Sequence, residues 1–178
     1  ILYAAAQASQ QLRDTAGAHA FWRQLDALVP ASDAAARRQS AWLGAELALA
    51  AGQPQQALDL VERHPAPQLR PAVLLHAQAQ LALQRPALAS ERLQTWVTTH
   101  PQDAQAWQWL AQAWQAQNQP LRALRAQAEA QVAIRDFSAA QDRLKAAQDL
   151  ARRGGNQDHI EASIIDTRLR AVTELLRE

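Results

Sequence analysis

Histidines and carboxylates are the side chains in this sequence that could hold a metal ion or move a proton. The five histidines are scattered along the chain, at His19, His64, His76, His100 and His159. A zinc site on one helix needs two histidines four residues apart, and no pair here has that spacing. The stretch His159-Ile160-Glu161 matches half of such a motif but lacks its second histidine. We therefore expect no metal site and no cofactor in this chain.

Other sequence patterns typical of enzymes are also missing. The chain has no glycine-rich phosphate loop, no Gly-x-Ser-x-Gly turn and no cysteine. Its carboxylates, such as Glu46, Asp59 and Glu129, are expected to lie on solvated helix faces. We expect these residues to carry no catalytic activity.

Charge and composition limit the partners and the fold. Lys and Arg total 18 against 17 Asp and Glu, and the two signs are interspersed. No basic block exists that could neutralise a run of phosphates, so we expect no nucleic acid partner. No run approaches the roughly 20 apolar residues of a membrane span. With 48% hydrophobic residues and only 5 glycines, the sequence favours helix nearly everywhere and predicts an all-α protein.

An internal repeat organises these helices. The stretches "GQPQQALDLV", "QRPALASERL" and "NQPLRALRAQ" each hold a proline followed three residues later by an alanine. These alanines, Ala57, Ala89 and Ala123, are 32 and 34 residues apart. Proline suits the first turn of a helix, and a small alanine one turn later lets two antiparallel helices approach closely. Each stretch therefore predicts the start of the second helix of a hairpin.

The pattern predicts four helical hairpins and two C-terminal helices in one domain, residues 1–178. The hairpins cover about 1–30, 33–65, 69–101 and 103–135, and the remaining helices lie in 137–178. We expect individual helices near 1–14, 16–29, 33–51, 54–64, 69–84, 86–99, 103–117, 120–134, 137–153 and 157–177. Gly154 and Gly155 are expected to end the ninth helix. The last helix carries a predicted inward stripe of Ile160, Ile164, Leu169, Val172 and Leu176.

The period and the residues at its key positions resemble the tetratricopeptide repeat (TPR) family. The best copy, from Gln105 to about Arg135, has Trp107, Leu110, Ala111, Trp114, Ala123 and Ala130 at the pattern positions. Other copies depart from the pattern, at Gly44, His76 and Gln80. The resemblance implies a right-handed α-α superhelix closed by the C-terminal helices. Trp107 and Trp114 should pack against the partner helix, whereas Trp109 points about 200° from Trp107 and faces the next repeat or a groove.

In TPR arrays the first helix of each repeat lines a concave groove. Helical spacing predicts that lining here as Tyr3, Gln7, Trp42, Glu46, Leu49, Leu74, Gln78, Leu81, Gln105, Gln108, Gln112 and Gln115. It lacks the Lys, Arg and Asn side chains that would grip a terminal carboxylate. An amide-rich lining suits extended peptide backbone instead. The alternative is that these glutamines are only a soluble helix surface.

The last 75 residues or so carry a narrower resemblance. The helix from Trp107 to Trp114, "AQAEA", "RDFSAAQDRLKAA" and the closing "IDTRLRAVTELLRE" resemble the C-terminal TPR region of BepA-like bacterial zinc metalloproteases, the β-barrel assembly-enhancing proteases. The resemblance implies a periplasmic protein whose protease domain, with its zinc and His-Glu-x-x-His motif, lies upstream. The chain has no methionine, so we expect it to be part of a longer polypeptide.

These observations predict a non-catalytic protein–protein interaction module. By resemblance, its partners would be β-barrel outer-membrane proteins and their assembly machinery, presented to the upstream protease. One alternative is a freestanding TPR scaffold or secretion-assembly protein with no link to proteolysis. Another is a regulatory TPR lobe of a transferase or a cytoplasmic sensor.

Overall fold

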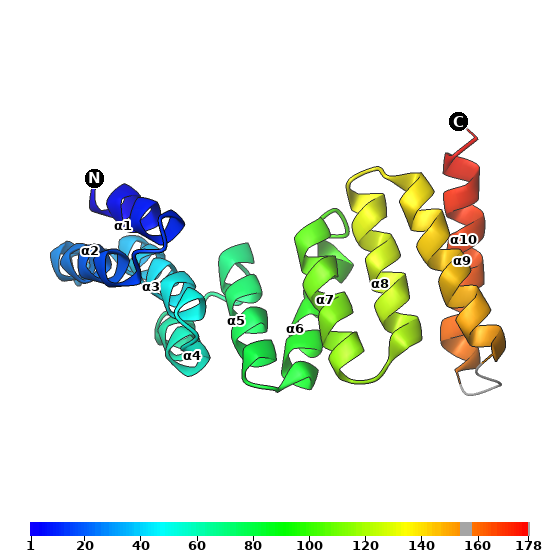
Figure 1. Ribbon diagram of the computed structural model, residues 1–178, viewed down its shortest axis with the longest axis horizontal. Coiled ribbons are helices and arrows are strands. Elements are labelled where there is room, and N and C mark those ends of the chain that lie inside the picture. The colour runs from blue at the N-terminus through cyan, green and yellow to red at the C-terminus, as the bar shows by residue number, and fades with distance from the viewer. Residues whose placement is uncertain (154–157, 178) are drawn as a thin grey trace. The chain divides into compact units, whose positions relative to one another are not determined.

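The computed structural model describes residues 1–153 and 158–177, and these residues form ten α-helices and no strand (Figure 1). The helices are α1 (Leu2–Gln11), α2 (Thr15–Leu28), α3 (Ala34–Ala50), α4 (Pro54–Arg63), α5 (Arg70–Ala82), α6 (Pro86–Thr99), α7 (Ala104–Ala116), α8 (Pro120–Ala133), α9 (Phe137–Arg153) and α10 (His159–Leu175). The predicted all-α fold is confirmed. The expected stop at Gly154 and Gly155 lies outside the described residues, as does the expected start of the last helix at 157.

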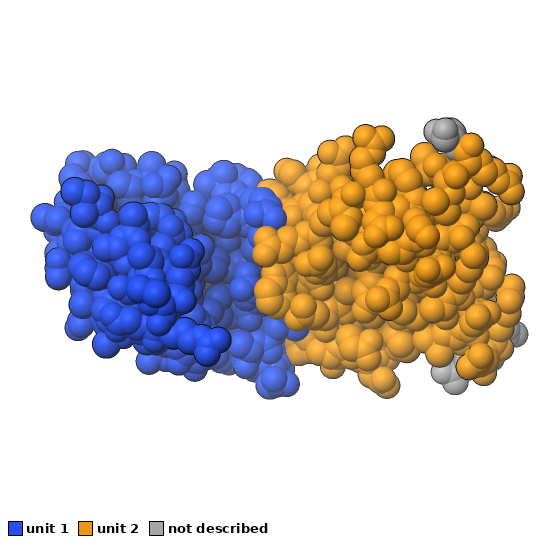
Figure 2. Space-filling model, turned by 45° about the horizontal axis from the view of Figure 1, so that its top comes forward, with its two compact units in different colours: residues 1–85 blue, residues 86–178 orange. Residues whose placement is uncertain are grey.

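The chain divides into two compact units, Ile1–Arg85 and Pro86–Glu178 (Figure 2). The boundary lies between α5 and α6, inside the third predicted repeat. In unit 1, each helix from α1 to α5 packs against the next, and in unit 2 α6 to α10 do the same. Packing between consecutive helices is consistent with the predicted helical-repeat solenoid.

Five turns between helices share one backbone conformation. Each contains a residue with positive φ, between 56° and 70°: Arg13, Gly52, Gln84, Asn118 and Arg135. The residue after it donates its backbone N–H to the carbonyl five residues back, as Gln53 does to Ala48 at 2.8 Å. Five residues after each positive-φ position lies an alanine that is at most 1% exposed: Ala18, Ala57, Ala89, Ala123 and Ala140. The alanines that define the repeat in the sequence are therefore buried where the helices pack together.

Trp22 fixes the approach of α2 to α3. Its indole Nε1–H donates to the backbone carbonyl of Ser40 at 2.8 Å. Its ring lies so close to Gly44 that a Cβ added there would sit 2.4 Å from a ring carbon. Gly44, which departs from the TPR pattern, is thus the one residue type that leaves room for the tryptophan.

The tryptophans of helix α7 follow the expected packing only in part. Trp114 and Leu110 are buried, and the Arg122 guanidinium from α8 lies 5.0 Å from the centre of the Trp114 ring. Trp107 is half-buried and donates its indole N–H to the Pro101 carbonyl at 2.9 Å, so it also serves the turn before its own helix. Trp109 is half-buried as well.

The predicted inward stripe of α10 is wrong at three positions. Ile160, Ile164 and Leu176 are exposed, whereas Glu161 and Ile165 are buried; Val172 is buried and Leu169 packs against the core, as predicted. Charged partners on α8 explain this orientation, because Arg125 pairs with Glu161 and Glu129 pairs with Arg168 at 2.7 Å. The apolar pattern does not record such pairs, so in the first two turns of α10 it placed the inward face about one residue away from its true position.

Replacing Gly44 by Ala should lower the free energy of unfolding by about 1–2 kcal/mol, because overpacking against Trp22 outweighs the better helix propensity of alanine. Chemical denaturation measures the change. In a Trp22→Ala background the same substitution should be neutral or stabilising, since the crowding ring is gone. Equal effects in both backgrounds would contradict the assigned contact.

Trp114→Ala should destabilise the chain by roughly 3–5 kcal/mol, as expected for truncating a large core side chain. Trp109→Ala, at a half-buried position on the same helix, should cost clearly less. A thermal melt of Trp114→Ala that overlays the parent would contradict its burial.

Candidate protein-docking site

Helix α3 exposes only a narrow stripe. Most residues of its middle turns are buried: Ser40, Ala41, Leu43, Gly44, Ala45, Leu47 and Ala48. Trp42, Glu46 and Leu49 remain partly exposed, and Gln39 is exposed. They recur every three or four residues and therefore share one face of the helix. This face, which we call the α3 stripe, holds three of the predicted groove residues.

Helix α1 carries two further predicted residues. Ala6 of α1 belongs to the same core cluster as Leu43 and Leu47 of α3, so the two helices contribute to one part of the core. Tyr3 and Gln7 lie on either side of Ala6 in the sequence, and the Gln7 side-chain amide donates to the Tyr3 hydroxyl oxygen at 3.3 Å. The two residues are thus held together on α1.

Glu46 carries a charge that the described part of the chain leaves uncompensated. No ion pair or hydrogen bond reaches its carboxylate from any described residue. Burial raises the pKa of Glu46 above its ordinary 4.5, because a half-buried carboxylate loses hydration. Burial and the nearby negative charge of Glu46 also raise the pKa of the Tyr3 hydroxyl, so Tyr3 and Glu46 lie within electrostatic reach of each other.

Trp42 contributes an unused hydrogen-bond donor. Its ring packs against the core cluster that includes Ala45 and Leu75. Its Nε1 atom is buried and has no hydrogen-bond partner among the described residues. By contrast, Trp22, Trp96 and Trp107 donate their indole N–H groups to Ser40, Asp103 and Pro101. A buried donor without a partner is costly, so this N–H group lowers the stability of the free chain.

The predicted lining on α5 is mixed. Leu74 is buried at 5% exposure, so it belongs to the interior. The buried neighbours of Leu74 on α5 explain this, because that helix is apolar around most of its circumference. Gln78 and Leu81 are partly exposed.

Sequence reasoning missed a buried polar pair on α5. The side-chain amide nitrogen of Gln80 lies 3.4 Å from Nε2 of His76, and Gln80 is only 4% exposed. Its amide oxygen has no hydrogen-bond partner among the described residues. Both residues depart from the TPR pattern, and that departure was the available signal.

Unit 2 carries the remaining predicted lining residues on α7. Gln105, Gln108, Gln112 and Gln115 are all exposed and follow one helix face at intervals of three and four residues. Their side-chain amides form a row along this face, and half-buried Trp109 lies beside the row.

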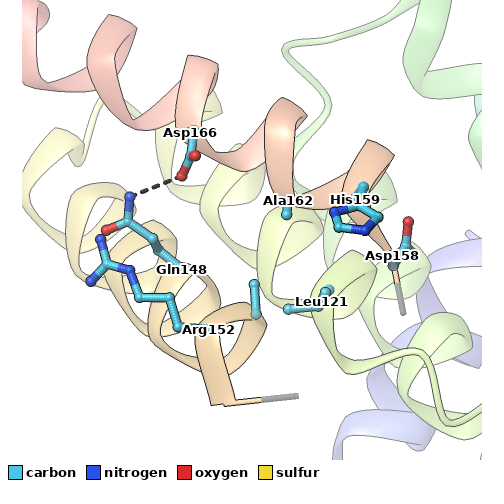
Figure 3. A pocket seen from close by; sticks show the side chains of 8 residues that line it. Leu121, Gln148, Arg152, Asp158, His159, Ala162 and Asp166 are labelled. Atoms are coloured by element: carbon cyan, nitrogen blue, oxygen red, sulfur yellow. Dashed lines mark hydrogen bonds between the residues drawn. The ribbon is translucent and has the colours of Figure 1, made fainter. Parts of the chain in front are cut away.

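A small pocket lies at one end of unit 2, where α8, α9 and α10 meet (Figure 3). Its volume is about 240 Å³, with Leu121, Ala151 and Ala162 among its lining residues. Two of its carboxylates are already engaged: Asp166 accepts a hydrogen bond from Gln148 at 2.9 Å, and Asp158 accepts one from the Glu161 backbone N–H at 3.1 Å. Arg152 and His159 also line the pocket. It therefore offers fewer unused polar groups than its composition suggests.

The described residues contain no group of three His, Cys, Asp or Glu side chains placed to hold a metal ion. Two of the histidines have structural positions: His100 stacks on Trp96, with ring centres 3.7 Å apart, and His64 is the C-cap residue of α4. Among the described helices, none is both long and apolar enough to cross a membrane.

Comparison with known protein families and with curated proteins gives no match for this chain. The site is therefore interpreted from its geometry.

Replacing Glu46 by Gln should raise the free energy of unfolding at pH 7 by about 0.5 kcal/mol, a value discounted for solvent screening. The folded state binds a proton at Glu46 more tightly than the unfolded state, so the penalty is present above the raised pKa. It disappears as the pH falls below the ordinary value of 4.5. Denaturation curves across this range measure the difference. Glu91→Gln, on an exposed position of α6, is the control, and a gain that does not depend on pH would contradict the assignment.

Proposed function

We propose that this chain is a non-catalytic protein–protein interaction module that binds a partner segment along the α3 stripe and the adjoining face of α1. The observation that carries the proposal is the half-buried carboxylate of Glu46, which has no partner among the described residues and lies one helical turn from the partly exposed side chain of Trp42. An unused acceptor beside an aromatic ring suits a peptide, which offers both N–H donors and apolar side chains.

The resemblance described in the sequence supports a narrower proposal. In it, the chain is the docking module of a periplasmic zinc metalloprotease, and it holds outer-membrane β-barrel precursors or their assembly machinery for a protease domain elsewhere in the polypeptide. The proposal places zinc and catalysis in that domain. A reading frame without a His-Glu-x-x-His helix upstream would remove the protease from the account and favour a freestanding scaffold.

Selection from a display library of random 12-residue peptides tests the docking proposal. Trp42→Ala should weaken the selected peptides about fivefold to tenfold, because it removes the partly exposed aromatic side chain of the α3 stripe. Trp109→Ala is the matched control, since Trp109 is also half-buried but lies on α7 rather than on the α3 stripe. Failure to select any saturable binder, or equal losses in both variants, would contradict the proposal.

A further inference from the structure

We propose that Glu46, with Tyr3 and Trp42 beside it, receives the guanidinium of an arginine side chain from the bound partner segment. This inference rests on the docking function proposed above and names the chemistry that the α3 stripe selects. Three features carry it: an uncompensated carboxylate, aromatic side chains around it, and the absence of a competing cation within reach among the described residues.

The carboxylate is the first feature. Glu46 is partly buried on α3, and its sequence neighbour Leu47 belongs to the buried cluster of Ala6, Leu43 and Leu47. A negative charge in such a place attracts a cation more strongly than a fully solvated one does. The raised pKa of Glu46 agrees with this position, because burial of the carboxylate disfavours its charged form.

The surrounding side chains favour arginine over lysine. Tyr3 is 43% exposed and is held by Gln7, so its ring is available on the surface of α1. Trp42 lies one helical turn before Glu46 on the same face. A guanidinium can stack on such rings while it donates two hydrogen bonds to a carboxylate, and it is more weakly hydrated than an ammonium group.

Basic residues of the chain itself do not fill this position. Arg38 lies on the same face of α3, but it precedes Glu46 by eight residues, which is about 12 Å along a helix axis and beyond ion-pair reach. Arg37, the residue before Arg38, donates to the Pro30 carbonyl at 3.3 Å. No ion pair joins Glu46 to a basic residue in the described part of the chain.

Titration of the 178-residue chain with acetyl-Gly-Arg-Gly-amide tests the inference by NMR. The readout is the indole N–H resonance of Trp42, identified by its loss in Trp42→Phe. The arginine peptide should shift this resonance in a saturable way at millimolar concentration. The citrulline peptide, which has the same shape without the charge, should bind at least fivefold more weakly.

Variants separate a specific contact from a general charge effect. Glu46→Gln should weaken the arginine peptide at least fivefold, whereas Glu91→Gln, which removes the same charge from an exposed helix, should leave it unchanged. Spectra of Glu46→Gln that retain the parent dispersion show that the variant is folded. Equal binding of the arginine and citrulline peptides, or unchanged affinity in Glu46→Gln, would overturn the inference.

The display selection distinguishes this inference from the docking function. Selected peptides that depend on Trp42 but bind equally well after arginine-to-citrulline replacement would keep the docking function and refute the arginine contact. A selection without binders would refute the docking function, while the tripeptide titration would still decide the chemistry of Glu46.

Discussion

Close approach of helices at alanine is the constraint on which the rest of the structure depends. A helix alone cannot bury its apolar face, so within each unit every helix packs against the next. At Ala18, Ala57, Ala89, Ala123 and Ala140 the side chain is a single methyl group at most 1% exposed, one turn into the helix that follows a tight turn. A methyl group adds little apolar area, so the stabilisation comes from the close contact that it permits between neighbouring backbones and from the larger side chains packed around it.

This packing encloses α3 and leaves the α3 stripe as its accessible face. An enclosed helix gains stability from apolar residues, yet the stripe holds Glu46 and the indole N–H of Trp42 without partners among the described residues. Both features cost stability in the isolated chain. Such costs are typical of functional surfaces, where a group that destabilises the free protein is satisfied by the ligand. If these groups had a purely structural role, removing either one would lower the free energy of unfolding instead of raising it.

Much of the fold could be predicted because helix periodicity and the proline–alanine spacing are local signals. The positive-φ turns at Arg13, Gln84, Asn118 and Arg135 were harder, since three of these four residues are not typical of that conformation and only the closing hydrogen bonds reveal it. The orientation of α10 depends on Arg125 and Glu129, which are distant in sequence. For the candidate site, spacing identified Trp42 and Glu46, but their missing partners and the burial of Leu74 follow from tertiary packing alone.

The most direct test of the central claim is a structure of the chain bound to a peptide from the display selection. The account predicts that the peptide lies along the α3 stripe and that its arginine side chain reaches the Glu46 carboxylate, with donor–acceptor distances near 2.8–3.0 Å. A peptide seated on another face, with Glu46 still without a cation, would contradict it.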